Sequence, residues 1–162
     1  MPTYVYPQPE WTEKSAELYS EVFEKKLAIL SGNWAYRINA EPDWGIEEDI
    51  YFTMFLEAGK LRELRHCTKA YAFDKADFVL SASPSQWKKI LTKKEKFVGA
   101  FLGGRIKLEK GDTVGSMAAA PHANTLVDVL TQVDLRFPDE LSPEELASFK
   151  EDFAKKRSER GI

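Results

Sequence analysis

Cysteine and histidine are scarce in this 162-residue sequence, which has one cysteine, Cys67, and two histidines, His66 and His122. A single cysteine excludes an internal disulfide and a multi-cysteine metal site, and it is typical of a reducing compartment. Neighbouring side chains on a strand point to opposite faces, so His66 and Cys67 cannot share a metal ion without distortion. No motif places a histidine to activate Cys67, which we interpret as a buried structural thiol. We therefore expect no catalytic residue, no metal site and no cofactor.

A basic surplus and long apolar runs are missing as well. The formal net charge is −3 and no nucleic-acid-binding motif is recognised, so no nucleic-acid partner is expected. No apolar run approaches membrane-spanning length, and the start, MPTYVYPQPEW, lacks the basic and apolar regions of a signal peptide. Apolar residues make up 43% and charged residues 30%, as in ordinary globular domains. We expect a soluble, cytoplasmic, single-domain protein.

Hydrophobic periodicity predicts the elements of the first half. Three prolines favour an extended, aromatic N-terminal arm over residues 1–10. Apolar spacing over residues 10–30 predicts one amphipathic helix. Alternation predicts four strands, with Phe52 and Met54 on one face of the second. These strands lie in NWAYRINA (33–40), in DIYFTMFLEAGKLRELRHC (49–67, folded at 57–60) and in ADFVLSAS (76–83), the last preceded by a turn at AFDKAD (72–77).

Capping signals organise the second half. Ser83, Pro84 and Gln86 form a capping-box pattern that opens a short helix, and Ser142 repeats the pattern before a C-terminal helix. Between them we expect a helical turn in KEKFVGAFLGG (94–104) and a fifth strand in RIKLEKGD (105–112). Asp112 can cap the helix that follows, and Pro121 interrupts it. The tail KKRSERGI (155–162) is expected to fray.

Two segments near residue 100 could bind a ligand. Gly99 and Gly104 have the spacing of a phosphate loop, but Arg105 stands where that loop needs lysine, and the order is helix to strand, so a tight turn is the better interpretation. The lysines at 88, 89, 93, 94 and 96 form a basic cluster. Such a cluster is most often a solvated face, and the alternative is a patch for anionic head groups.

The order of these elements resembles the sterol carrier protein type-2 family of lipid-transfer domains over roughly residues 11 to 133. The most specific parts are ADFVLSASPSQWKKIL and the pattern AF-x-GG-R-I-K-L-x-K-GD at residues 100–112. The resemblance implies an α/β (α+β) fold, with a single five-stranded, mostly antiparallel sheet covered by helices. It also implies an apolar tunnel between sheet and helices that takes up fatty acids, fatty acyl-CoA, sterols or phospholipids without catalysis.

On this interpretation residues 1–10 are an extended arm, residues 11–140 a lipid-binding domain, and residues 141–162 a C-terminal amphipathic helix and tail of the same domain. The expected tunnel lining is apolar, and the expected head-group contacts are cationic. The lining residues are Trp87, Leu91, Phe97, Phe101, Leu102, Phe52 and Met54. The head-group residues at the mouth are Lys93, Lys94, Lys96 and Arg105.

Other functions remain open at this point. Large side chains could fill the tunnel, leaving an interaction module that forms a homodimer or docks on an enzyme of lipid metabolism through a sheet edge or the N-terminal arm. A lipid carrier could also contact a membrane surface transiently. A small hydrolase or isomerase using His122 or Cys67 is the third hypothesis, although an ordinary surface position is the better interpretation of His122.

Overall fold

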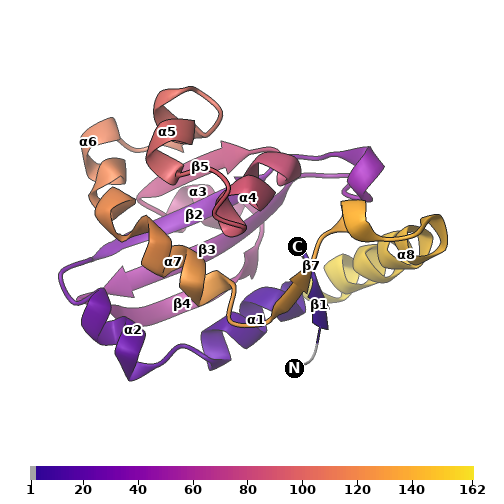
Figure 1. The fold of residues 1–162 in the computed structure, drawn as a ribbon, viewed down its shortest axis with the longest axis horizontal. Coiled ribbons are helices and arrows are strands. Elements are labelled where there is room, and N and C mark those ends of the chain that lie inside the picture. Colours follow the sequence, from indigo (N-terminus) through magenta and orange to yellow (C-terminus); the bar gives the residue numbers. More distant parts are fainter. Residues whose placement is uncertain (1–2) are drawn as a thin grey trace.

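A computed structural model describes residues 3–162 and shows an α+β fold built on one five-stranded sheet (Figure 1). The strands lie in the order β4-β3-β2-β5-β6, and only the β2–β5 pairing is parallel. Their bounds are β2 (Gly32–Ile38), β3 (Ile50–Glu57), β4 (Lys60–Cys67), β5 (Phe78–Ala82) and β6 (Lys107–Lys110). The expected fold class, a mostly antiparallel five-stranded sheet covered by helices, is confirmed.

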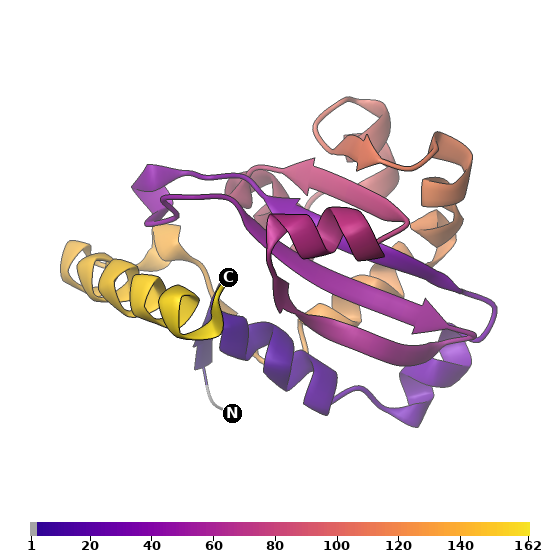
Figure 2. The same ribbon diagram turned by 180° about the vertical axis from the view of Figure 1, so that it is seen from behind.

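Both faces of the sheet are covered, but unequally. The helices α1 (Pro9–Glu17), α4 (Pro84–Leu91) and α7 (Ala123–Leu130) cross one face, whereas α3 (Lys69–Lys75) lies on the other (Figures 1 and 2). Because side chains alternate along β2, Trp34 and Tyr36 point to the larger core and Ala35 to a small cluster around Tyr51 beneath α3. The larger apolar layer therefore lies between the sheet and α1, α4 and α7.

The segment expected to be one helix over residues 10–30 is two helices, α1 and α2 (Glu21–Lys26). The chain leaves the helical conformation at Ser20, whose φ of −117° and ψ of 168° are extended. The Tyr19 hydroxyl donates to the carbonyl of Gly59 in the β3–β4 turn. This long-range bond ties the break to the sheet, and the apolar spacing within residues 10–30 contains no sign of it.

A second correction concerns AFDKAD (72–77), which was expected to be a turn; residues 72–75 belong to helix α3, and Ala76 ends it. Thr68 caps this helix, because its side chain accepts a hydrogen bond from the Tyr71 N–H at 3.1 Å. Ala72 and Ala76 on the inner side are buried against the sheet. A capping threonine followed by alanines on one helix face indicates such a helix, but hydrophobic periodicity does not detect it.

The N-terminal arm folds back onto the protein. Thr3–Val5 forms β1, which pairs in parallel with β7 (Asp134–Arg136), a strand that the sequence patterns did not indicate. The Tyr6 N–H continues this ladder by donating to the Arg136 carbonyl at 2.8 Å. The extended conformation expected for residues 1–10 is present at Thr3–Val5, whereas residues 6–7 form a turn and α1 begins at Pro9. Residues 1 and 2 lie outside the described part of the chain.

The expected caps of the second half are present. Ser83 accepts from the Gln86 N–H, and Asp112 accepts from the Gly115 N–H at the start of α6 (Thr113–Ser116). Gln86 does not complete the capping box, since its side chain donates to Glu95 instead. The remaining elements here are α5 (Phe97–Leu102) and a 3-10 helix, Met117–His122, which contains Pro121 and separates α6 from α7.

The C-terminal helix α8 (Pro143–Arg160) is longer than expected, because the tail predicted to fray is helical up to Arg160. Arg157 holds the tail by donating to the carbonyls of Glu48 and Asp49 at 3.1 and 3.0 Å. Phe149 and Phe153 are buried in the larger core. Short 3-10 turns at Pro42–Trp44 and Pro138–Glu140 complete the described chain. No helix within residues 3–162 is both long and apolar enough to cross a bilayer.

Candidate functional site

A small apolar cavity lies between the sheet and the helices that cover it. Its volume is about 60 Å³. The sheet contributes Trp34, Tyr36, Phe52 and Leu80. Helix α4 contributes Trp87, Ile90 and Leu91, and α7 contributes Ala123, Leu126, Val127 and Leu130. Tyr6, Trp11, Phe97 and Ala119 close the remaining sides. No charged side chain is among these described lining residues.

Local sequence rules explain why these side chains meet. Alternation along β2 puts Trp34 and Tyr36 on the same face. The Ser83 cap sets the start of α4, so that Trp87, Ile90 and Leu91 recur at helical spacing on its inner side. Each of these elements therefore presents its apolar side to the same space.

Aromatic contacts form most of the wall. The ring centroid of Phe52 lies 5.4 Å from that of Trp11 and 5.1 Å from that of Tyr36. Trp11 in turn lies 5.0 Å from Tyr6, and Tyr36 lies 5.7 Å from Trp87 in an edge-on arrangement. Tilted and edge-on pairs at such separations add to the stability gained from burial alone. The wall is thus a continuous aromatic surface from the N-terminal arm to α4.

Some polar atoms of these aromatic residues form hydrogen bonds within the protein, and others do not. Trp11 Nε1 donates to the Leu130 carbonyl at 2.7 Å, and Trp87 Nε1 donates to the Arg37 carbonyl at 3.0 Å. In contrast, Trp34 Nε1 and Tyr6 Oη are buried with no hydrogen-bond partner among the described residues. Burial, with a smaller effect of Glu41, raises the pKa of Tyr6 well above its ordinary value. The Tyr6 hydroxyl is therefore neutral at physiological pH.

The expected lining residues are only partly gathered at the cavity. Phe52, Trp87, Leu91 and Phe97 line it. Met54 is buried in the same core and Phe101 stacks on Phe97, but neither lines the cavity.

Leu102 is 73% exposed and points away. It is the last residue of the six-residue helix α5, which buries Ala100 and turns its end to solvent. Several lining contributions were not predicted, namely those of Tyr6, Trp11, Trp34, Tyr36, Leu80, Ile90, Ala119 and α7. The amphipathic spacing of Leu126, Val127 and Leu130 was the available signal.

The four cations expected at the mouth do not form one group. Lys93 is paired with Asp128 at 2.6 Å, and Arg105 donates to Glu95 at 2.6 Å. Lys94 and Lys96 are exposed, and neither forms an ion pair within the described part of the chain. A head group could therefore meet Lys94 and Lys96 without competition, whereas Lys93 and Arg105 already have carboxylate partners.

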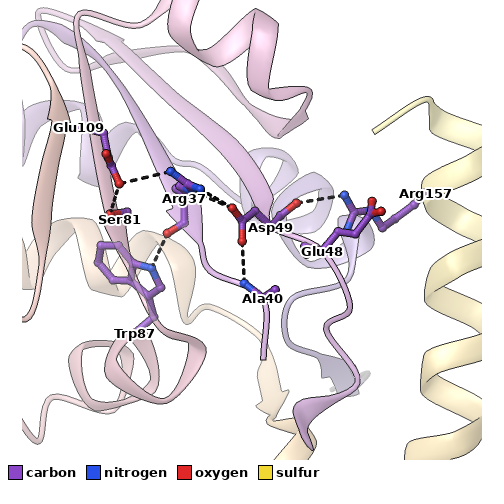
Figure 3. A network of polar contacts seen from close by, with 8 residues as sticks. All are labelled: Arg37, Ala40, Glu48, Asp49, Ser81, Trp87, Glu109 and Arg157. Atoms are coloured by element: carbon purple, nitrogen blue, oxygen red, sulfur yellow. Dashed lines mark hydrogen bonds and ion pairs between the residues drawn. The ribbon is translucent and has the colours of Figure 1, made fainter. Parts of the chain in front are cut away.

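A polar network supports the cavity from the other side of β2 (Figure 3). Arg37 donates to Asp49 at 2.9 Å and to Glu109 at 3.3 Å, and Ser81 donates to Glu109 at 2.8 Å. Burial opposes ionisation of Asp49, but the Ala40 N–H and the Arg37 guanidinium outweigh it and hold the pKa of this carboxyl below its ordinary value. Since the Arg37 carbonyl accepts from Trp87, the network also fixes one wall of the cavity.

The residues weighed for catalysis are not assembled into a site. His66 is buried, its Nε2 lies 2.6 Å from the Pro7 carbonyl, and its Nδ1 lies 2.8 Å from Thr12 Oγ1. Burial lowers the pKa of His66 to about 4 and raises the pKa of Cys67 to about 12. Cys67 is therefore a thiol at neutral pH, a poor nucleophile. Residues 3–162 contain no group of three His, Cys, Asp or Glu side chains arranged to hold a metal ion.

Comparison with known proteins decides the family. The model of the SCP-2 sterol transfer family matches residues 16–123, more than half of the chain. This chain belongs to the SCP-2 sterol transfer family. The match covers the sheet, α4, α5 and the 3-10 helix, so most of the cavity wall lies within the family domain. The family is one of lipid transfer rather than catalysis.

Solved structures share the fold of this SCP-2 family member. A crystal structure of sterol carrier protein 2 is 24% identical, with a TM-score of 0.65, and the match covers 78% of this chain and 97% of that one. The solution structure of a Thermus thermophilus protein, described as possibly a sterol carrier protein, is 25% identical, with a TM-score of 0.62 over 78% of this chain and 85% of that one. No curated protein sequence is significantly similar to this chain.

Proposed function

We propose that this protein binds an apolar lipid in the cavity between the sheet and helices α4 and α7, and carries it without catalysis. The observation that carries the proposal is a cavity walled by aromatic and aliphatic side chains alone. Membership of a sterol transfer family supports it. Each methylene of a ligand buried there would contribute about 0.8 kcal/mol, so an acyl chain or a sterol-like ring system can bind without directional contacts.

Uptake of such a ligand requires the cavity to widen. Its volume of about 60 Å³ compares with roughly 300 Å³ at the lower end for ordinary ligand pockets. Phe97 and Ala119 belong to α5 and the 3-10 helix, short elements that bury few residues. We propose that these two elements move outward to admit the ligand. Leu102 and Val114 are exposed on α5 and α6, and with Lys94 and Lys96 they would contact the membrane that supplies it.

Filling the cavity tests this function. Ala123→Phe places a ring at the N-terminal end of α7, where Ala123 lines the cavity, and we expect it to weaken uptake of a fluorescent fatty acid by about tenfold. Val22→Phe, a change at an exposed position on α2 that does not line the cavity, should leave uptake unchanged. Both variants are compared with wild type after delipidation, with thermal unfolding as the check on folding. Equal binding by folded Ala123→Phe protein would count against the cavity as the site.

The small cavity volume also favours a second candidate, a module that no longer holds a ligand and instead binds another protein or a second copy of itself. Residues Thr3–Val5 are engaged with β7 inside the chain, so a sheet edge is the better docking surface than the arm. Native mass spectrometry of freshly purified protein separates the candidates. An added mass in the range of a lipid supports the carrier, and a ligand-free dimer supports the module.

A further inference from the structure

Two buried hydrogen-bond donors in the cavity wall have no partner. Trp34 and Tyr6 are each 1% exposed, and both line the cavity. Neither Trp34 Nε1 nor Tyr6 Oη has a hydrogen-bond partner within residues 3–162. Burying a polar group without a partner is unfavourable, and most native proteins avoid it. Their occurrence in the wall of the proposed binding site calls for a partner that enters with the ligand.

The two donors lie toward different ends of the cavity. Trp34 is in the first half of β2 and stacks on Phe78 at the start of β5. Tyr6 packs on Phe137, with 5.1 Å between the ring centroids, and the Phe137 ring in turn packs edge-on against Trp44, which follows β2. One water molecule is therefore a poor partner for both donors. A water beside Trp34 Nε1 would also lack the two to four polar partners that hold buried water in place, whereas on the Tyr6 side the buried Oε2 of Glu41 is a second atom without a partner.

The chemistry of the donors restricts the ligand group. An indole Nε1–H only donates, and the neutral Tyr6 hydroxyl has a proton to donate. A carbonyl oxygen accepts and brings no proton of its own, so it satisfies a donor without leaving a new group unpaired. An alcohol or a protonated acid would bring an additional O–H that needs an acceptor.

The absence of charge in the described lining restricts the ligand further. A carboxylate moved into this wall would lose its hydration without meeting a cation, which is strongly unfavourable. A fatty acid could bind only with its carboxylate left at the surface, near Lys94 and Lys96. A neutral ester or ketone can enter completely.

We propose that the cavity prefers a neutral lipid with an ester or ketone oxygen, which accepts a hydrogen bond from Tyr6 Oη, with Trp34 Nε1 as a second donor toward the opposite end. This inference rests on the proposed function, because it requires the cavity to take up a ligand. It goes further by naming the polar group that the ligand carries and the side chains that meet it.

A pair of ligands and a pair of variants test the proposal. A long-chain methyl ketone and the alkane of matched chain length are titrated into delipidated wild type, Tyr6→Phe and Tyr51→Phe proteins. Tyr51 is the matched control, since its hydroxyl is also buried without a partner in the described chain but lies in the smaller cluster on the other face of the sheet. Tyr6→Phe should weaken ketone binding about fivefold, the effect of one lost hydrogen bond, and leave alkane binding unchanged. Tyr51→Phe should change neither.

Indole NMR signals test the second donor without a substitution. The Nε1–H of Trp34 should shift on binding a diketone that carries a carbonyl toward each end of its chain, but not on binding the alkane. Trp11 and Trp87 serve as internal controls, because their Nε1–H groups already donate to the carbonyls of Leu130 and Arg37.

The possible outcomes distinguish a failure of the proposed hydrogen bond from a failure of lipid binding itself. If the wild type binds both ligands and Tyr6→Phe changes neither, or weakens both equally, the proposed hydrogen bond is overturned while the carrier function stands. If the Trp34 signal shifts equally with the diketone and the alkane, its role as a second donor is overturned. If the wild type binds neither ligand, the proposed function fails and the inference fails with it.

Discussion

His66 links the N-terminal arm, α1 and the sheet at the scale of a single residue. Its Nε2 donates to the Pro7 carbonyl and its Nδ1 bonds to Thr12, while its ring lies 6.1 Å from that of Phe52 in the cavity wall. Burial lowers the pKa of this histidine to about 4, whereas in the unfolded chain it is about 6.5. The unfolded state therefore binds more protons between these two values, and the folded state is penalised there.

From this difference we expect the free energy of unfolding to be fully retained above about pH 6.5 and to fall as the pH drops toward 4. The loss attributable to His66 approaches roughly 3 kcal/mol. Urea unfolding at pH 7.5 and pH 5 measures it. His66→Gln should flatten this dependence, whereas His122→Gln at the other histidine should retain it. An undiminished pH dependence in His66→Gln would show that other groups cause the effect.

The β3–β4 hairpin shows how an element depends on one backbone position. Its turn contains Ala58 and Gly59, with φ of 49° and 80°, values at which glycine is favoured. A Cβ added at Gly59 would lie 2.3 Å from the Glu24 carbonyl oxygen of α2. The hairpin and α2 can therefore pack this closely only because residue 59 has no side chain.

Gly104 is the matched control for this position. Its φ of 78° is almost the same, but a Cβ there would meet no atom within 4 Å. Gly104→Ala should cost about 1 kcal/mol for the strained backbone alone. Gly59→Ala should cost at least about 2 kcal/mol more, because the backbone of α2 must shift. Thermal and urea unfolding measure both changes, and similar values for the two variants would refute the steric argument.

At the scale of the whole molecule, α8 is joined to the sheet although it lies outside the segment that matches the family. Arg157 donates to the carbonyls of Glu48 and Asp49, and Asp49 continues the network to Arg37 and the carbonyl that holds Trp87 (Figure 3). Helix α8 is thus linked to the cavity wall through a series of hydrogen bonds, in addition to the burial of Phe149 and Phe153 in the larger core.

Removing this link should therefore destabilise the protein. Arg157→Ala is expected to lower the free energy of unfolding by about 2 kcal/mol, since two hydrogen bonds from a charged donor to backbone carbonyls are lost. Lys155→Ala, an exposed change two residues away on the same helix, should stay within about 0.5 kcal/mol of wild type. Urea unfolding compares them. Equal stability of the two variants would show that the hydrogen bonds of Arg157 do not stabilise the protein.

Sequence patterns alone were enough to predict several features of this protein. Alternation in β2 and β3, the caps at Ser83, Asp112 and Ser142, and the family segment around Gly103 depend on neighbouring residues, so they can be recognised in the order of the chain. The fold class was implied by the family resemblance that these local features carry. The aromatic and apolar character of the cavity wall follows as well, since Phe52, Trp87 and Leu91 lie at predictable positions on their elements.

Only the tertiary structure decided the rest, because it depends on contacts between residues far apart in the chain. The break after α1 is tied to Gly59, the arm pairs with a strand beyond residue 130, and Lys93 finds Asp128 as its partner. The volume of the cavity and the two unpaired donors in its wall have the same origin. They result from how the side chains of separate elements pack together, which no local spacing encodes.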